Sequence, residues 1–170
     1  MAEAGIGSRH RLELEPAPKL AIWTTPPGPR ELQAVLDSVS PEIVYLFAID
    51  PETVRLESFL QRLAGLVKYA LRTDADRAIQ GQVNLSKLAA ASAHRLVTVR
   101  KGLDWLAAKG YLSILEEEGE DLVLAQGGRP VPDVERLTAQ VRSLLEETQA
   151  YRAYFAEAEK DQLPLPFHPV

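Results

Sequence analysis

The stretch 84–126 constrains the fold of this chain more than any other part of its sequence. Asn84 belongs to the residue types that cap helices, so a first helix is expected directly after it. A turn is expected at 93–95, and a second helix over 96–109 that ends at Gly110, because glycine readily adopts the left-handed conformation that closes helices. The second helix has one apolar face at the spacing i, i+3, i+4, i+7, made of Val99, Gly102, Leu103 and Leu106.

Two short apolar runs follow the second helix and are separated by a turn that contains glycine. The runs are 111–115 and 122–126, and the turn between them, 116–121, carries five acidic side chains. Apolar runs joined in this way predict a β-hairpin. Helix, turn, helix and hairpin in this order predict a winged helix-turn-helix over 73–128, a module that binds duplex DNA, another protein or other parts of its own chain.

The charges of this module argue against tight binding of duplex DNA. Asp104 stands in the middle of the outward face of the second helix, where a recognition helix carries Arg, Lys, Asn or Gln. The stretch 84–126 holds five basic and six acidic residues, and five minus six gives a balance of −1. Because neutralisation of phosphates supplies most of the affinity for DNA, weak or no duplex binding is expected.

The composition indicates a cytoplasmic protein without a catalytic site in this chain. The 170 residues carry a net charge of −5 and include no cysteine, which excludes disulfides, thiolate metal sites and cysteine nucleophiles. None of His10, His94 and His168 has a second histidine or paired carboxylates at metal-ligand spacing, so no cofactor is expected, and His94 is expected to pack. No apolar run is long enough for a signal peptide or a membrane span.

A small βαβ unit with a connecting helix is expected over 19–72, behind a flexible leader over 1–18. The strands are expected at 19–24 and 43–49, and the helix between them begins at Pro29, a residue type that favours the first helical position. Strand, helix and strand in this order imply parallel pairing. The second strand is continuously apolar, which predicts burial on both of its faces.

The connecting helix is expected to open at Asp50-Pro51, and a polar loop is expected to follow it over 73–82. The last part, 129–170, is expected to hold a long helix from Pro132-Asp133 to about Lys160 and a proline-rich tail. The predicted fold is therefore α/β (α+β), a small βαβ unit followed by a winged helix-turn-helix and a long C-terminal helix.

Apolar residues recur along this last helix at alternating intervals of three and four, as in a heptad seam. The seam consists of Val134, Leu137, Val141, Leu144, Thr148, Tyr151, Phe155 and Ala158. Such a seam serves one of two purposes. Either the helix packs along the winged module of its own chain, or it pairs with a second copy or a neighbouring domain through 133–160.

Four segments taken together resemble the C-terminal accessory region of RecJ-type single-strand-specific DNA exonucleases, which belong to the DHH family. They are WTTPPGP at 23–29, VYLFA at 44–48, LAGLVKYA at 63–70 and GLDWLAAKG at 102–110, and the similarity covers roughly 19–125. The resemblance implies a role in DNA repair and recombination. It also implies a catalytic core elsewhere in a longer parent protein, where Asp and His residues bind Mn²⁺ or Mg²⁺ for 5′–3′ degradation. This chain has no Asp-His-His, so no catalytic residue can be transferred to it.

Two functions remain open. The first is a non-catalytic accessory domain that docks protein partners, namely the catalytic core of its parent exonuclease and the acidic, apolar-ended tail of a single-strand-binding protein. The second is a stand-alone winged-helix transcriptional regulator that dimerises through 133–160. For an acidic tail, the candidate surface combines cations with apolar neighbours: Lys87, Arg95, Arg100 and Lys101, with Val97 and Trp105. The alternative is that these cations are ordinary solvated charges.

Overall fold

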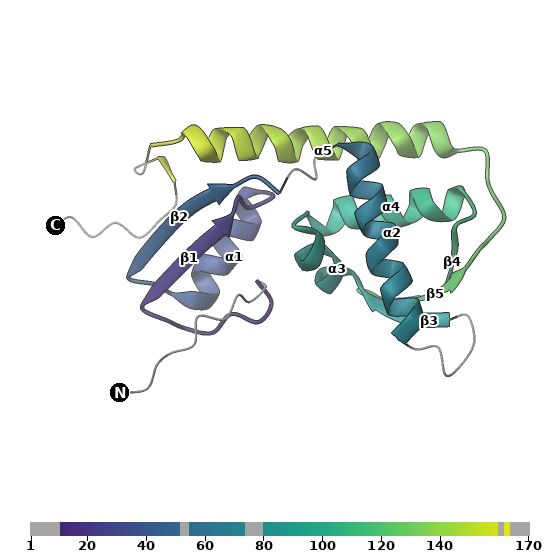
Figure 1. The fold of residues 1–170 in the computed structure, drawn as a ribbon, viewed down its shortest axis with the longest axis horizontal. Coiled ribbons are helices and arrows are strands. Elements are labelled where there is room, and N and C mark those ends of the chain that lie inside the picture. The colour runs from purple at the N-terminus through teal and green to yellow at the C-terminus, as the bar shows by residue number, and fades with distance from the viewer. Residues whose placement is uncertain (1–10, 52–54, 74–79, 160–161, 164–170) are drawn as a thin grey trace.

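The computed structural model describes residues 11–51, 55–73, 80–159 and 162–163, and over them the chain has a mixed α/β fold with two small sheets. The elements in chain order are β1 (Lys19–Thr24), α1 (Pro29–Val39), β2 (Ile43–Ile49), α2 (Leu56–Thr73), β3 (Gln80–Asn84), α3 (Leu85–Ser92), α4 (Leu96–Ala108), β4 (Leu112–Glu118), β5 (Asp121–Gln126) and α5 (Val134–Glu157). In Figure 1, β1, β2 and α1 form one unit, the elements from α2 to β5 form another, and α5 runs along both. None of the helices over the described residues is long and apolar enough to cross a membrane.

The first unit confirms the predicted strand, helix and strand. β1 and β2 pair in parallel, with Lys19 opposite Ile43 and Ala21 opposite Tyr45. Alternate residues of β1 point to α1, and a helical stripe on α1 meets them, so that one small core forms between the sheet and the helix. Its buried members in these elements are Leu20, Ile22, Leu32, Leu36 and Val39.

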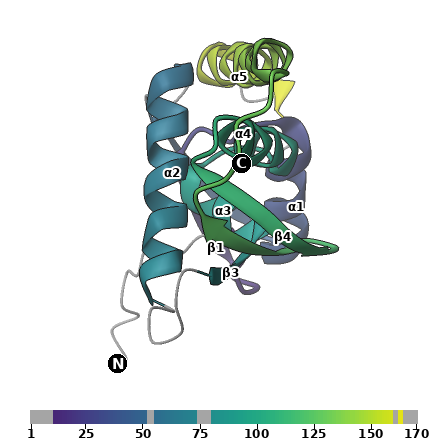
Figure 2. The ribbon, with the colours of Figure 1, turned by 90° about the vertical axis from the view of Figure 1, so that its right-hand side faces the viewer.

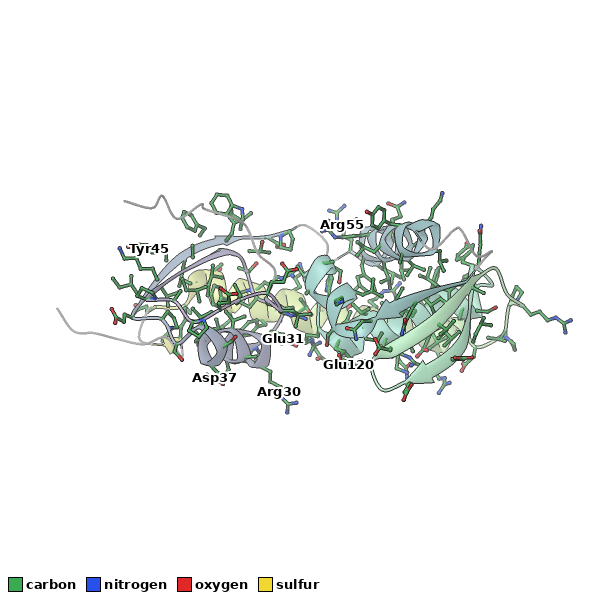
Figure 3. All side chains as sticks on the ribbon, turned by 90° about the horizontal axis from the view of Figure 1, so that it is seen from below. Arg30, Glu31, Asp37, Tyr45, Arg55 and Glu120 are labelled. Carbon is green, nitrogen blue, oxygen red and sulfur yellow. The ribbon has the colours of Figure 1, made fainter. Side chains whose placement is uncertain are left out.

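The prediction that β2 is buried on both faces is wrong. Exposure alternates along the strand: Val44 and Leu46 are partly buried, while the outward residues Ile43, Tyr45, Phe47 and Ile49 are all exposed. Figure 3 shows Tyr45 on the opposite side of the sheet from Asp37 and Arg30 of α1. The apolar run gave no sign of this difference, because it records only that both faces are apolar and not whether a second layer covers them.

The second unit also has the predicted order of helix, turn, helix and hairpin. Asn84 caps α3, since its side-chain oxygen accepts a hydrogen bond of 3.1 Å from the backbone N–H of Lys87. Ala93, with φ of 56°, forms the left-handed turn between α3 and α4, and Gly110, with φ of 76°, follows α4 as predicted. β4 and β5 form the antiparallel hairpin.

A third strand, β3, was not predicted. It begins at 80, in the stretch 73–82 expected to be a polar loop, and continues to Asn84. It pairs antiparallel with β5, with Val83 opposite Leu122, so that the sheet order is β3-β5-β4. The segment has a single large apolar residue and no alternation, and its pairing partner lies far along the chain. The helix before this strand, α2, begins at Leu56, whereas the sequence predicted a start at Asp50-Pro51. Residues 52–54 lie outside the described part of the chain.

The close approach of α2 to α4 depends on Gly102. A Cβ atom at Gly102 would lie 2.5 Å from Cδ2 of Leu63 and 2.8 Å from Cε1 of Phe59, both of which are buried in the core. Phe59 also meets the buried ring of His94 edge to face, with ring centroids 4.7 Å apart. The packing role predicted for His94 is therefore confirmed.

α5 joins the two cores. Figure 2 shows it lying along α4, with α2 beside them. Val141 and Leu145 belong to the core of the second unit, and Phe155 belongs to the core of the first. The helix therefore packs within its own chain.

The buried stripe of α5 differs from the predicted seam, whose members Val134, Leu137 and Ala158 are only partly buried. It consists of Val141, Leu145, Thr148, Arg152 and Phe155, so Leu145 and Arg152 are buried where Leu144 and Tyr151 were predicted. Adjacent residues satisfy the three-four spacing equally well, and the rotation of the helix is set by the surfaces it meets. The helix spans 134–157, slightly less than predicted.

Residues 11, 14 and 17 contact the rest of the fold, which differs from the flexible leader predicted over 1–18. Leu14 and Ala17 lie against the core of the first unit, and the N–H of Ala17 donates to the carbonyl oxygen of Val39 at 3.0 Å. Arg11 donates to the carbonyl oxygen of His94 at 3.1 Å. Residues 1–10 lie outside the described part of the chain.

Candidate functional site

We define the outer face of α4 as Val97, Arg100, Lys101 and Asp104. Its two cations form ion pairs with neighbouring carboxylates. Oδ1 of Asp104 accepts a hydrogen bond from Nε of Arg100 at 3.1 Å, and Oδ2 accepts one from Nζ of Lys101 at 3.3 Å. Arg100 also pairs with Glu117 of β4. Burial by itself lowers the pKa of Arg100, but the hydrogen bonds and charges of Glu117 and Asp104 outweigh it and raise the net pKa.

The other two predicted cations point elsewhere. Arg95, the N-cap residue of α4, reaches α5, where it donates to the carbonyl oxygen of Leu144 at 3.0 Å and to Glu147 at 2.9 Å. Lys87 is exposed in the first turn of α3. The structure therefore does not bring Lys87, Arg95, Arg100 and Lys101 together as one open cationic patch.

Trp105 and Val97, the two apolar neighbours predicted for these cations, do not line one common surface. Its indole Nε1–H donates to the hydroxyl of Thr138 in α5 at 2.8 Å, and Nζ of Lys109 lies 5.5 Å from the centroid of its ring. Val97 is exposed on the outer face of α4. The two side chains therefore lie on different surfaces of the protein.

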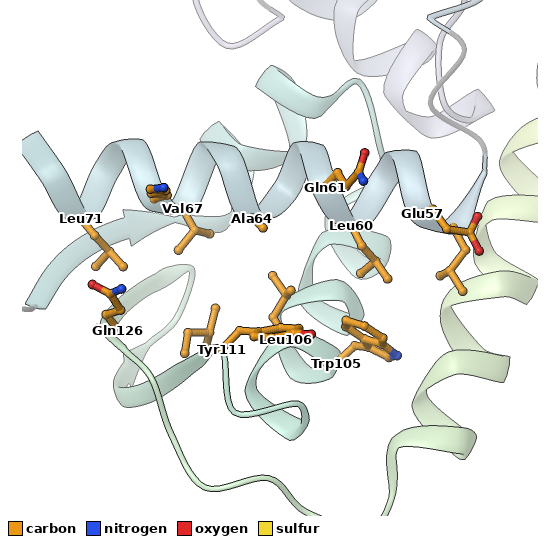
Figure 4. A pocket seen from close by; sticks show the side chains of 13 residues that line it. Glu57, Leu60, Gln61, Ala64, Val67, Leu71, Trp105, Leu106, Tyr111 and Gln126 are labelled. Carbon is orange, nitrogen blue, oxygen red and sulfur yellow. The ribbon is translucent and has the colours of Figure 1, made fainter.

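Trp105 instead lines an apolar groove between α2 and α4, which we call the α2–α4 groove (Figure 4). Its volume is about 970 Å³. One wall is a stripe of α2, and the other is formed by the end of α4 and the start of β4. The apolar lining residues are Leu56, Leu60, Ala64, Val67, Leu71, Trp105, Leu106, Tyr111 and Leu112.

The groove was missed in the sequence because α2 carries more apolar residues than its core face requires. Phe59 and Leu63 are fully buried against α4, while Leu56 and Ala64 stay partly open beside the groove. A wide apolar stripe of this kind is the signal that was available. It does not by itself distinguish a broad core contact from an open groove.

Few charges border the groove. Lys68 of α2 lines it, Lys109 stands over Trp105, and Glu57 lies at the end nearest Trp105 (Figure 4). Gln61 and Gln126 supply neutral hydrogen-bonding groups. Two lysines beside an apolar floor suit a peptide that combines apolar side chains with carboxylates.

Over the ranges that the structure describes, no three His, Asp or Glu side chains are grouped as metal ligands. Comparison of the chain with models of protein families, with curated proteins and with solved structures finds no match. The α2–α4 groove therefore remains the best-defined candidate site on geometric grounds.

Proposed function

We propose that this chain is a non-catalytic protein-docking domain that binds an acidic, apolar-ended peptide in the α2–α4 groove. The observation that carries the proposal is the groove itself, which combines an apolar lining that includes Trp105 with the lysines Lys68 and Lys109. Apolar anchors in such a groove supply affinity, and cations at its border select acidic partners.

The proposed architecture of the second unit is a winged helix. The order α2, β3, α3, α4, β4, β5 and the antiparallel sheet β3-β5-β4 support it. The ion pairs of Arg100 and Lys101 favour a protein partner over duplex DNA, because cations engaged by Asp104 and Glu117 have less to offer to phosphates.

The proposed parent is a RecJ-type single-strand-specific DNA exonuclease, in which this chain would be the accessory region beside a metal-dependent catalytic core. The partner that follows is the acidic tail of a single-strand-binding protein. The packing of Val141, Leu145 and Phe155 within the chain favours this proposal over a regulator that dimerises through 133–160. The purified chain should release no nucleotides from single-stranded DNA with Mn²⁺ or Mg²⁺, and EDTA-sensitive release would contradict this.

Calorimetric titration with an acidic peptide that ends in apolar residues tests the groove. Lys68→Glu should weaken binding at least about tenfold, roughly 1.4 kcal/mol, because it replaces an attractive charge by a repulsive one. Lys87→Glu is the matched control, since Lys87 is also an exposed lysine on a helix but lies outside the groove. The Lys87→Glu variant should bind the peptide with the affinity of the wild type.

The double variant Arg100→Glu/Lys101→Glu separates the two candidate surfaces. If the peptide binds in the α2–α4 groove, this variant should bind as the wild type does, provided that circular dichroism shows it folded. Loss of binding here, with Lys68→Glu unaffected, would return the site to the outer face of α4 and overturn the proposal.

A further inference from the structure

The first unit presents an exposed apolar surface on the side of its sheet opposite α1. We define this sheet face by five side chains that are 44–61% exposed: Trp23, Ile43, Tyr45, Phe47 and Ile49. Trp23 and Phe47 are in contact, with ring centroids 4.8 Å apart. An exposed cluster of large apolar side chains on adjacent strands marks an interaction site, because parallel strands are ordinarily covered on both faces.

A β-bulge helps to shape this face. Ile22 pairs with Leu46 and Thr24 with Ile49, so β2 has one more residue than β1 between these pairs. Ala48 lies in this extra segment with φ of 52°, a left-handed conformation that is unfavourable for alanine. Phe47 and Ile49, on either side of Ala48, are both exposed, and Ile49 is paired with Thr24, the residue after Trp23.

We propose that the sheet face binds the same face of a second copy of this chain, in a two-fold-symmetric dimer with two sheets packed face to face. Identical sheets pair readily in this way, since alternate side chains of the two inner faces interdigitate. The copies carry a net charge of −5 each and repel one another in general. The outward strand positions hold no carboxylate and only one charge, Lys19.

The charges at the two ends of the sheet favour one direction of packing. Lys19 stands at the start of β1, and Asp50 follows the end of β2, so they lie at opposite ends of the sheet. A two-fold axis across the strands places Lys19 of each copy near Asp50 of the other. The Asp50 side chain is 53% exposed, and one of its oxygens, Oδ1, already lies 3.9 Å from Nη1 of Arg152 in the same chain, so a lysine of the second copy would join an existing pair.

The available area matches a weakly associating dimer. A large aromatic side chain buries about 150–250 Å², so three half-exposed aromatics and two isoleucines offer on the order of 500 Å² per copy. Two copies together bury about 1,000 Å², which is the lower limit for a specific interface. Stacking of nucleic-acid bases on these rings is disfavoured, because Lys19 is the single cation at the outward strand positions.

Sedimentation velocity on the whole chain, from low to several hundred micromolar, tests the proposal. The wild type should pass from a mass of 18.8 kDa to about twice that value as concentration rises. Phe47→Asp should raise the dissociation constant at least about 100-fold, because dimerisation would bury an unpaired carboxylate. Val97→Asp makes the same kind of change at an exposed apolar residue on α4 and should leave the dimer intact.

A second measurement reports on the interface itself. The chain has two tryptophans, so in a Trp105→Phe background the emission comes from Trp23 alone. Quenching of Trp23 by acrylamide should rise on dilution, as the dimer dissociates and exposes its ring. Circular dichroism verifies that each variant is folded.

Three results would overturn the proposal. The first is a wild type that stays at 18.8 kDa throughout the concentration range. The second is a folded Phe47→Asp variant that dimerises like the wild type, which would place the contact elsewhere, for example on α5. The third is a monomer whose Trp23 is shielded only by added single-stranded oligonucleotide, which would identify the sheet face as a base-stacking surface.

Discussion

The guanidinium of Arg152 in α5 donates a hydrogen bond to the carbonyl oxygen of Ala93, the left-handed residue between α3 and α4. Arg152 is only 2% exposed, and its Nη1 lies 3.9 Å from Oδ1 of Asp50 at the end of β2. One side chain therefore links α5 to both units. Burial lowers the pKa of Arg152, and the charge of Asp50 partly opposes this effect.

Arg152→Ala should lower the free energy of unfolding by about 1–3 kcal/mol, because it leaves the partly buried carbonyl of Ala93 without this donor. Arg152→Met should cost less. It fills the same space and removes a buried charge whose Nε and Nη1 have no hydrogen-bond partner among the described residues. Urea denaturation followed by circular dichroism measures both, with the exposed Arg142→Ala as control. Equal stability of Arg152→Ala and wild type would show that the contact is dispensable.

Ala93→Gly should raise the free energy of unfolding by about 0.5–1 kcal/mol. Alanine pays a steric penalty at φ of 56° that glycine does not, and this gain exceeds the entropy that glycine adds to the unfolded chain. Thermal denaturation measures the change. Ala91→Gly is the control, because Ala91 lies inside α3, where the same substitution should lower the free energy of unfolding. A loss of stability in Ala93→Gly would contradict the left-handed conformation of the turn.

Gly102→Ala should destabilise the protein by about 1–3 kcal/mol, because the new methyl group overlaps Leu63 and Phe59 in the core. Gly65→Ala is the matched change in α2, where nothing lies within 4 Å of the added Cβ. It should stabilise the helix by up to about 1 kcal/mol. Parallel urea titrations of the two variants measure the contrast, and shifts of the same sign would contradict it.

Hydrogen bonds from Arg136 hold the pKa of Asp133 below its ordinary value, at the start of α5. Because the pKa of Asp133 is lower in the folded than in the unfolded state, the pair stabilises the fold at pH values above the unfolded pKa. This stabilisation is lost as the pH falls through the lower pKa that Asp133 has in the folded state. NMR titration of the Asp133 carboxyl carbon should show the depressed pKa, and Arg136→Gln should return it to the ordinary range. An identical pKa in both proteins would rule out the pairing.

Duplex DNA should bind with a Kd no tighter than about 10⁻⁵ M at physiological salt, in the non-specific range. The reason is that Asp104 and Glu117 engage the cations of the outer face of α4. Fluorescence anisotropy with labelled duplexes measures the affinity. Sequence-selective binding at nanomolar protein would contradict this prediction and would favour a transcriptional regulator.

Features set by neighbours along the chain could be predicted from the sequence. The cap at Asn84, the left-handed Gly110 that follows α4 and the alternation of β1 each depend on a few adjacent residues, whose conformational preferences act locally. The absence of a cysteine or of spaced histidine ligands is also a property of the sequence alone. The local preferences predict most of the element order.

Features set by distant segments needed the tertiary structure. Val83 became part of a strand because β5 offered a free edge, and Leu145 is buried in place of Leu144 because two separate cores fix the rotation of α5. The sequence by itself determined which residues are apolar, including those of β2 and the position of Trp105. Only the tertiary structure decided which of them face solvent or a groove, because burial depends on whether another layer of the fold lies opposite.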